Sequence, residues 1–543
     1  MPLPGRLVVA AAAVVAIVVS LVQLRADERG ITRVTGEVQG TPIAVYRATG
    51  PGPGPGPGAE AAPVVVVAHG FAGSQRLMES FALHLAGRGY VVVTYDFVGH
   101  GRHPAPMTGA LGDQDGTPLV LIRQTREVVD HALALPGVDG RLATVGHSMA
   151  TNILVRHAQE DERVAATVAV SMFAPTIEPE SPPNLLAVVG ALEGRLEAES
   201  RRVVAMVADL EAEAVQPFVT YGDPLAGGAR RLVVSPRVEH VGVLFSRTTL
   251  EETGAWLDAV FQRGPDASPA PAEGRALARG RWIALLLAGV FVLAWPLAGW
   301  LPRVGSGAGT GGANASWRRL FLVAGIPALL TPLLLALVPT SFLPVVVGDY
   351  VAVHFGTFGL LAGLLLWWSG GRPGLRDILD RSGLRGGDRG NGGNRGDGVR
   401  ILGGAALMMV FFLVLMAWPL DRYFTAFFPV AERLPLLLAV LVGTLPYFVT
   451  DEWLTRGADA RRGAYAVTKL LFLLSLGLAV ALDFGGLFFL LIIVPVILVF
   501  FLVHGLFSRW IFRRTGSPLV AGLGNAVAFA WALAVTFPLY AGL

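Results

Sequence analysis

The chain has 543 residues, more than one ordinary domain, and 53% of them are hydrophobic with a mean hydropathy of +0.57, which excludes a wholly soluble protein. The net charge is only +3 and the basic residues are spread over short segments, so the composition argues against nucleic acid as a partner. Since the chain contains no cysteine, disulfides, a thiolate nucleophile and a Cys-ligated metal are excluded.

The first predicted element is a hydrophobic helix near the N-terminus. After Arg6, the run from Leu7 to Leu24 carries no charge, and at about 1.5 Å rise per residue it nearly crosses a hydrocarbon core of roughly 30 Å. No clean A-x-A cleavage site follows, which favours a retained anchor over a cleaved signal peptide. We therefore assign residues 1–29 to a signal anchor.

Residues 30–264 are predicted to form an α/β domain. Short β-branched runs alternate there with amphipathic, charged stretches, the pattern of a sheet covered by helices. The repeat Pro51–Gly58 suits neither a helix nor a central strand and is expected to form a stiff surface loop between two early strands. Residues 265–280, rich in Pro, Ala and Gly, are interpreted as a linker.

Three predicted strands of this domain end in loops with candidate chemistry. The strand at 63–68 leads into HGFAGS, and the strand at 90–95 leads into DFVGHGRH. A helix at about 119–135 precedes the strand at 141–145, which ends in GHSMA around Ser148. A nucleophile elbow requires a strand, a serine flanked by small residues and then a helix, because the serine occupies a strained turn. Ser148 is therefore the predicted nucleophile, at a helix N-terminus that favours an anionic intermediate.

Together these segments resemble the α/β-hydrolase superfamily over roughly residues 40–264, most closely its lipase-like, dienelactone-hydrolase-like and prolyl-oligopeptidase-like members. HGFAGS, YDFVGHGRH and GHSMA have the order and spacing of that family. Ala150 replaces the final glycine of its G-x-S-x-G pattern, a small residue that some members tolerate. The resemblance implies a doubly wound α/β sheet, and it implies oxyanion donors at the backbone N–H groups of Phe71 and Met149.

A serine nucleophile needs a histidine to take its proton and a carboxylate to orient that histidine, in the chain order Ser, acid, His. The strand predicted at 184–189 leads into GALE, which looks like the family's G-x-x-D and makes Glu193 the predicted acid. Asp223, in YGDP, is the alternative acid. The strand at 231–234 is followed by SPRVEH and a helix pattern, so His240 is the predicted base. This chemistry uses no metal and no cofactor.

Other histidines lie close to these loops in the sequence. His69, His100 and His103 are expected to be structural or to line the pocket, and His147 to pack beside the elbow. His157 falls on the predicted elbow helix and is not a candidate base.

The C-terminal half, residues 281–543, is predicted to be an all-α, polytopic bundle of transmembrane helices. Eight apolar segments of spanning length recur there, at 281–302, 319–339, 344–369, 401–419, 433–450, 464–483, 485–506 and 517–541. An inside N-terminus puts most Arg-bearing loops on the cytoplasmic face and the hydrolase domain on the extracytoplasmic side of the cell membrane. The Gly- and Arg-rich loop 370–400 has too little apolar content to fold and is expected to be disordered.

Ionisable residues inside apolar spans are functional hypotheses, because charge is costly within a membrane. Asp349 and His354 share one predicted helix and are candidates for a role beneath the hydrolase pocket. Asp421 and Asp483 fall at predicted helix ends, where charge is tolerated. They are therefore weaker candidates.

A second, weaker resemblance lies in the bundle. DEWLTR at 451–456 has the spacing of the E-E-x-x-x-R motif of CAAX-protease-like intramembrane peptidases, and Phe500 to His504 has the spacing of their F-x-x-x-H. The first Glu is Asp451 here, the family's later histidine is missing, and only Asn525 stands near its place. We therefore interpret these residues as a charge cluster at the membrane interface instead of a second peptidase site.

The sequence thus predicts acyl transfer to water, in which Ser148 attacks a carboxylic ester with His240 as base and water releases the acyl-enzyme. A small-molecule or lipid-like acyl substrate is expected, because a multi-helix anchor holds the site at the lipid bilayer. Two alternatives stay open. A serine peptidase would use the same fold and triad, and a transporter or sensor, whose helices would show inverted repeats, would use the hydrolase-like domain only to bind a ligand.

Overall fold

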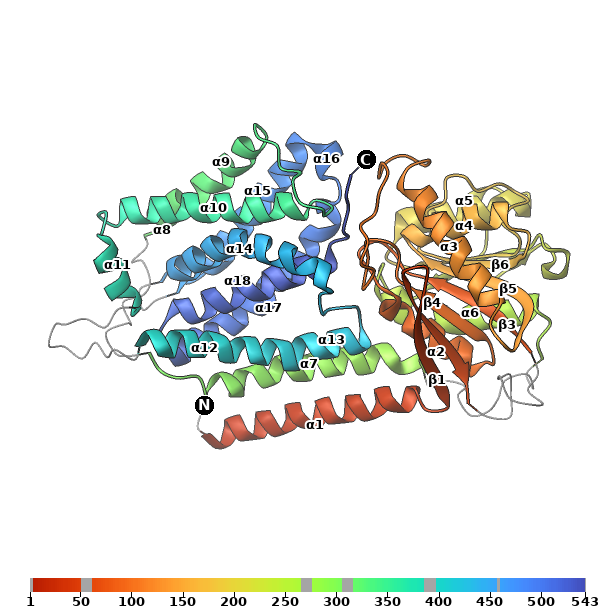
Figure 1. The fold of residues 1–543 in the computed structure, drawn as a ribbon, viewed down its shortest axis with the longest axis horizontal. Coiled ribbons are helices and arrows are strands. Elements are labelled where there is room, and N and C mark those ends of the chain that lie inside the picture. Colours follow the sequence, from red (N-terminus) through yellow and green to blue (C-terminus); the bar gives the residue numbers. More distant parts are fainter. Residues whose placement is uncertain are drawn as a thin grey trace. The chain divides into compact units, whose positions relative to one another are not determined.

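The computed structural model describes residues 3–49, 61–264, 276–304, 316–384, 397–456 and 460–542. The chain divides into two compact units. The sheet unit consists of Ala16–Leu286, Pro419–Val430 and Pro538–Leu543, and the helical unit consists of Met1–Val15, Leu287–Trp418 and Ala431–Phe537 (Figure 1).

Within the described residues, the sheet unit is built on a sheet of nine strands in the order β1-β2-β4-β3-β5-β6-β7-β9-β8. Their bounds are β1 Ile31–Val38, β2 Thr41–Ala48, β3 Ala62–Ala68, β4 Val91–Tyr95, β5 Val138–His147, β6 Val164–Val170, β7 Leu185–Gly190, β8 Thr220–Tyr221 and β9 Arg230–Ser235. The central strands from β4 to β9 run parallel, whereas β1, β2 and β8 pair antiparallel at the two edges. The carboxyl ends of the parallel strands therefore share one edge of the sheet.

Helices cover both faces of the sheet. They are α2 (Glu79–Gly87), α3 (Thr117–Leu133), α4 (Met149–Glu160), α5 (Gly194–Ala208) and α6 (Arg247–Val260). In β3, Val65 and Val67 join a core with α2 and α6, whereas Val64 and Val66 join a core with α3 and α4. Because both faces of β3 are buried, its sequence is a continuous apolar run. The predicted doubly wound α/β sheet is confirmed.

The segment Pro419–Val430 belongs to the sheet unit although it follows a helix of the bundle in sequence. The backbone N–H of Ala426 donates a hydrogen bond to Ser74 Oγ at 2.9 Å. The guanidinium of Arg102 donates to a carboxylate oxygen of Asp421 at 2.6 Å. Both partners on the sheet domain lie in loops that follow parallel strands, HGFAGS after β3 and DFVGHGRH after β4.

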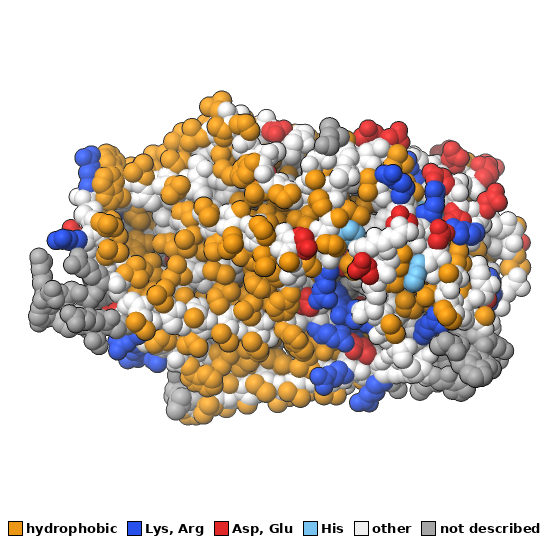
Figure 2. All heavy atoms as spheres, viewed as in Figure 1, with side chains coloured by type: hydrophobic (Ala, Val, Ile, Leu, Met, Phe, Trp, Pro, Cys, Tyr) orange, Lys and Arg blue, Asp and Glu red, His pale blue; other side chains and the backbone are white. Residues whose placement is uncertain are grey.

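Long helices make up the helical unit and the segments that lead into it. Their bounds are α1 Leu3–Asp27, α7 Arg279–Ala298, α8 Trp317–Leu320, η8 Phe321–Gly325, α9 Ile326–Leu335, α10 Gly348–Ser369, α12 Asp397–Phe411, η9 Phe412–Ala417, α13 Trp418–Tyr423, α14 Leu434–Thr455, α15 Ala464–Leu482, α17 Leu490–Thr515 and α18 Pro518–Thr536. Among the described residues, nine helical segments are long and apolar enough to cross a membrane. Hydrophobic side chains dominate the visible surface of these helices, whereas charged side chains are frequent over the sheet unit (Figure 2).

Glycines bring α14 close to α10. A Cβ at Gly443 of α14 would collide with the carbonyl of Ala352, and one at Gly359 of α10 would collide with the backbone of Tyr447. Small residues allow close packing of helices where lipid provides no hydrophobic driving force between them. The two glycines therefore explain how these helices approach.

The structure differs from the sequence prediction at several boundaries. The short helix α11 (Leu375–Ser382) lies within the loop 370–400 that was expected to be disordered, because Leu375, Ile378 and Leu379 recur at helical spacing. Helix α17 continues to Thr515, past the predicted end at residue 506, since apolar residues alternate with its arginines. Residues 51–58, 265–275 of the predicted linker and 385–396 lie outside the described residues.

Candidate active site

The loop between β5 and α4 places Ser148 in a strained backbone conformation, with φ 54° and ψ −117°. Positive φ is uncommon for a residue other than glycine and marks a tight, constrained turn. A Cβ at Gly146 would lie 2.8 Å from Leu154 Cδ1 and 3.1 Å from the backbone of Ala150, so a larger residue would crowd the start of α4. Ala150 is itself fully buried. Small residues on both sides of the serine thus let β5 and α4 pack closely.

Three predicted site residues meet at the carboxyl edge of the sheet. His240 Nε2 lies 2.9 Å from Ser148 Oγ. His240 Nδ1 lies 2.6 Å from Glu193 Oε1. Ser148 follows β5, Glu193 follows β7 and His240 follows β9. Residues separated by up to 92 positions therefore form a continuous hydrogen-bonded chain because parallel strands end side by side.

The carboxylate of Glu193 is held by several donors. Its Oε2 accepts hydrogen bonds from the backbone N–H of Gly190 at 2.7 Å and from Ser171 Oγ at 2.8 Å. Burial alone would raise the pKa of Glu193, but the hydrogen bonds from His240, Gly190 and Ser171 outweigh it and hold that pKa below its usual range. The group is therefore an anion across the physiological pH range.

His147 contacts the backbone of the loop that bears His240. Its Nε2 lies 2.9 Å from the carbonyl oxygen of His240, and the two rings are 4.7 Å apart. Burial, and then the nearby charge of His240, lower the pKa of His147 to about 3. The ring is therefore neutral and donates from Nε2, which ties the loop of His240 to the end of β5. From its position in the sequence, His147 was expected only to pack beside the elbow.

Ser171, which was not predicted from the sequence, also contacts the carboxylate of Glu193. Ser171 directly follows β6 and has a positive φ of 52°. Its hydroxyl donates a hydrogen bond to Glu193 Oε2. Its position could have indicated this contact, because Ser171 is a polar residue directly after β6, one of the parallel strands whose ends form the site.

The predicted oxyanion donors, Phe71 and Met149, belong to two backbone segments next to Ser148. Met149 is the first residue of α4, directly after Ser148. A Cβ at Gly70 would lie 2.9 Å from His147 Nδ1 and 3.0 Å from Ser148 Cβ, so the backbone before Phe71 passes directly beside the serine. The absence of a side chain at Gly70 permits this close approach.

The histidines of the two preceding loops make local contacts. His69 Nε2 accepts a hydrogen bond from the backbone N–H of Phe97 at 3.1 Å, and its Nδ1 then donates to the carbonyl of Gly70 at 2.7 Å. Burial lowers the pKa of His69. His103 Nδ1 accepts from the backbone N–H of Ala105 at 3.1 Å, and His100 Nδ1 lies 3.0 Å from the carbonyl of Val98.

The alternative acid is engaged elsewhere. The side chain of Asp223 accepts a hydrogen bond from the backbone N–H of Leu225 at 2.9 Å, where it caps a short 3-10 helix. Since Glu193 Oε1 contacts His240 Nδ1, the structure brings Glu193 and not Asp223 to this histidine.

Two other acidic candidates also accept hydrogen bonds from nearby backbone N–H groups. Asp349 accepts from the backbone N–H of Phe342 at 2.8 Å at the start of α10, and Asp483 accepts from Gly486 at 2.9 Å. Neither contact involves His354, which is fully buried in the helical unit beside the ring of Phe472.

The two acidic residues of DEWLTR are buried within the helical unit. Asp451 and Glu452 are 6% and 1% exposed, respectively. Asp451 pairs with Lys469 at 2.5 Å, and Glu452 pairs with Arg456 at 3.3 Å. Both residues lie near the C-terminus of α14, which ends at Thr455, and each carboxylate pairs with a cation within the helical unit. A position at the membrane interface stays a prediction.

The doubly wound sheet, with a strained turn between a central parallel strand and a helix at Ser148, defines the class of the sheet unit. It is an α/β-hydrolase domain. Residues 59–209 match the family model described as serine aminopeptidase, S33. No curated protein matches the chain.

Several solved structures are similar to parts of the chain. An epoxide hydrolase mutant from Vigna radiata is 23% identical over 28% of this chain and 41% of its own, with a TM-score of 0.21. A hypothetical protein from Pseudomonas aeruginosa is 13% identical over 42% of this chain and 92% of its own, with a TM-score of 0.30. A protein from Thermus thermophilus is 15% identical over 43% of this chain and 99% of its own, with a TM-score of 0.30. The chain spans about two fifths of the length of the epoxide hydrolases that it matches.

Proposed function

We propose that this protein is a membrane-anchored serine hydrolase that cleaves a carboxylic ester. The observation that carries the proposal is the chain of contacts from Ser148 Oγ to His240 Nε2 at 2.9 Å and from His240 Nδ1 to Glu193 Oε1 at 2.6 Å. A serine becomes a nucleophile when an adjacent base removes its proton, and the base needs a partner that fixes its tautomer.

In the proposed reaction, Ser148 Oγ attacks the acyl carbon while its proton passes to His240 Nε2. Glu193 accepts a hydrogen bond from Nδ1–H and stabilises the imidazolium. His240 then protonates the leaving alcohol, which departs and leaves an acyl group on Ser148. Water attacks the acyl-enzyme with His240 as base, and the acid product is released.

The negative oxygen of each tetrahedral intermediate needs donors that are in place before the reaction. We assign this role to the backbone N–H groups of Phe71 and Met149, and the approach of Gly70 to Ser148 supports the assignment. Met149 N also stands at the N-terminal end of α4, where the helix dipole favours an anion.

The long apolar helices support an anchor in the lipid bilayer. We propose a small-molecule or lipid-like acyl substrate, because an anchored site meets membrane-dissolved esters at high local concentration. The distribution of arginines over the loops favours a hydrolase domain on the extracytoplasmic side of the cell membrane.

A second candidate is a serine peptidase that uses the same residues. The match of residues 59–209 to a family model described as a serine aminopeptidase favours it. The triad itself does not distinguish an ester from an amide, because both reactions pass through an acyl-enzyme.

The test is labelling of purified membranes with a fluorophosphonate probe, which reacts with activated serines. We expect labelling of the wild type and its loss in Ser148→Ala and His240→Ala. Labelling should persist in Ser171→Ala, which removes a serine of the same site without removing the nucleophile. A folded wild type that stays unlabelled would overturn the proposal and favour ligand binding without catalysis.

Hydrolysis of matched ester and amide substrates then separates the two candidates. A panel of p-nitrophenyl esters of increasing acyl length and a panel of aminoacyl p-nitroanilides would be compared in wild type and Ser148→Ala. Serine-dependent turnover of the esters alone supports the esterase, whereas serine-dependent turnover of the anilides supports the peptidase.

A further inference from the structure

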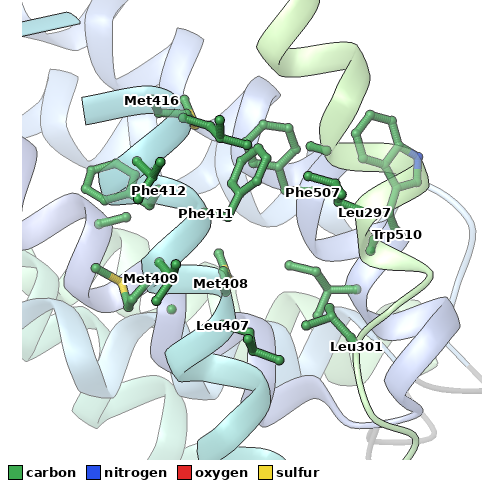
Figure 3. Close-up of a pocket in the computed structure, with 18 of the residues that line it drawn as sticks. Leu297, Leu301, Leu407, Met408, Met409, Phe411, Phe412, Met416, Phe507 and Trp510 are labelled. Carbon is green, nitrogen blue, oxygen red and sulfur yellow. The ribbon is translucent and has the colours of Figure 1, made fainter. Parts of the chain in front are cut away.

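The helical unit contains an apolar pocket of about 370 Å³ between α7, α12 with η9, α17 and α18. Leucine, methionine and aromatic side chains surround it, among them Met408, Phe411, Phe507 and Trp510 (Figure 3). Its volume falls within the range of about 300 to 1,000 Å³ typical of small-molecule sites.

The side of the pocket formed by α12 and η9 carries exposed residues. Leu407, Val410 and Val414 line it and are 53%, 56% and 57% exposed. Exposed apolar side chains on a membrane helix face lipid. A ligand would therefore enter from the hydrocarbon region of the bilayer.

One side chain in the lining is polar and buried. His504 is 2% exposed, and its Nε2 has no hydrogen-bond partner within the described residues. Its ring stacks on Phe500 with centroids 5.5 Å apart and contacts Phe529 at the same distance. A polar atom in such surroundings is costly unless a ligand supplies its partner.

A chain of hydrogen bonds determines the tautomer of His504. Glu452, paired with Arg456, accepts from the hydroxyl of Ser508. Since the Ser508 proton is used there, its oxygen accepts from Asn525 Nδ2, at 2.8 Å. Asn525 Oδ1 then accepts from His504 Nδ1, at 3.0 Å. Nδ1 therefore carries the proton, and Nε2 presents a lone pair.

We propose that this pocket binds a membrane-dissolved lipid alcohol, a single apolar chain ending in a hydroxyl group that donates a hydrogen bond to His504 Nε2. The apolar lining takes the chain, and the acceptor selects a donor over a hydrocarbon or an ether. The three lining methionines, Met408, Met409 and Met416, are flexible enough to shift as the hydroxyl approaches the histidine. The proposal does not depend on Ser148.

The test uses the full-length protein in nanodiscs and a photoreactive analogue of tetradecanol that carries a diazirine and an alkyne. We expect crosslinks in peptides from α12 and α17. Tetradecanol should compete with the probe about two- to tenfold better than methyl tetradecyl ether, the range that one hydrogen bond supplies.

Two pairs of variants make the test specific. His504→Phe keeps an aromatic ring but removes the acceptor, so the preference for alcohol over ether should disappear, whereas His504→Gln keeps an amide oxygen and should restore part of it. Val414→Trp fills the exposed side of the pocket and should reduce crosslinking, whereas Leu438→Trp, at a similarly exposed position of α14 outside the pocket, should not. Size-exclusion chromatography checks that each variant is folded.

Equal competition by alcohol and ether, a retained preference in His504→Phe, or crosslinks outside the pocket would each overturn the proposal. Ser148→Ala should crosslink like the wild type. This control separates the outcome from that of the proposed hydrolase, because loss of hydrolysis leaves the pocket intact.

Discussion

His147 and His240 are joined through a backbone carbonyl: the Nε2–H of His147 donates to the oxygen of His240 at 2.9 Å. His147 thus holds the loop that carries His240, the proposed base. The His240 side chain is 44% exposed, whereas that of Glu193 is 5% exposed, so the base depends on such contacts for its position.

Replacing His147 tests this positioning role. We expect His147→Phe to slow fluorophosphonate labelling by about ten- to a hundredfold, because a small displacement of a catalytic group costs that much. His147→Gln retains an N–H donor and should recover most of the rate. If both variants label equally slowly while remaining folded, the ring contributes packing and not the hydrogen bond.

The identity of the acid is tested by a matched pair of amide substitutions. Glu193→Gln removes the charge that accepts from His240 Nδ1 and should reduce kcat by about a hundredfold or more. Asp223→Asn changes the alternative acid, which caps a 3-10 helix, and should leave kcat within about twofold. Steady-state hydrolysis of an activated ester by both variants gives the comparison, and the reverse result would make Asp223 the acid.

Gly70 is predicted to be essential for activity because its backbone passes beside the nucleophile. In Gly70→Ala the new Cβ would lie 2.9 Å from His147 Nδ1 and 3.0 Å from Ser148 Cβ, so the loop must move. We expect at least about a tenfold fall in kcat/KM with a small change in Tm. Gly112→Ala is the control, since a Cβ there meets nothing within 4 Å. Equal activity of the two variants would argue against a functional role for this loop.

A buried ionic cluster stabilises the sheet unit. Glu79 is 1% exposed and contacts Arg76 at 2.9 Å, Arg422 at 3.7 Å and Arg279. Burial would raise the pKa of Glu79, but Arg279, Arg76 and Arg422 outweigh it, and its pKa lies below the usual range. These ion pairs therefore stabilise the fold above the unfolded-state pKa of about 4.3, and the contribution is lost as pH falls through the lower folded-state value.

Glu79→Gln removes the carboxylate that pairs with the buried Arg76. It leaves Arg279 with Glu28, at 3.4 Å. The substitution should lower the free energy of unfolding by about 3 to 5 kcal/mol. The control Glu160→Gln removes an exposed partner of Arg126 and should cost less than about 1 kcal/mol. Thermal unfolding of both variants, followed by intrinsic fluorescence, measures the difference. A Tm of Glu79→Gln equal to that of Glu160→Gln would show that the cluster is not stabilising.

The lowered pKa values of two buried histidines predict that the folded protein loses stability in acid. Burial, with Arg88 adding to it, lowers the pKa of His84 to about 3, and that of His147 is also lowered to about 3. Unfolded histidine titrates near about 6.5. Between these values the unfolded chain binds protons that the folded chain does not, so stability decreases as pH falls below about 6.5.

The variant with His84→Gln and His147→Gln removes both titrating groups. Its Tm should therefore fall less than that of the wild type when the pH is lowered from about 7.5 to about 5.5. Parallel Tm curves for the two proteins would refute this origin of the acid sensitivity.

The meeting of Ser148, Glu193 and His240 could be predicted from the sequence because each residue lies in the loop that follows a strand-like run. Parallel strands of a doubly wound sheet end at one edge, so order along the chain becomes proximity in space. The strained turn at Ser148 was also predictable, since Gly146 and Ala150 provide the necessary room.

Contacts set by tertiary packing could not be predicted in this way. The helix at 433–450 was predicted to end before Asp451 and Glu452 because the apolar run ends there. Nothing near Asp451 in the sequence indicates that it pairs with Lys469. His147 likewise resembled a packing residue, because its acceptor is a backbone carbonyl 93 positions away. Contacts between residues so far apart in the sequence leave no local sequence pattern from which they could be predicted.

The sheet unit contains segments that are synthesised at different times, so it cannot be completed until the last of them is made. Residues 16–286 emerge from the ribosome well before residues 419–430, yet Ser74 and Arg102 find partners in that later segment. In a nascent chain, Ser74 and Arg102 of the hydrolase domain can therefore make these contacts only after α12 and α13 have been synthesised. A fragment that ends at residue 264 lacks these contacts, so assembly of the domain is coupled to the synthesis of the helices.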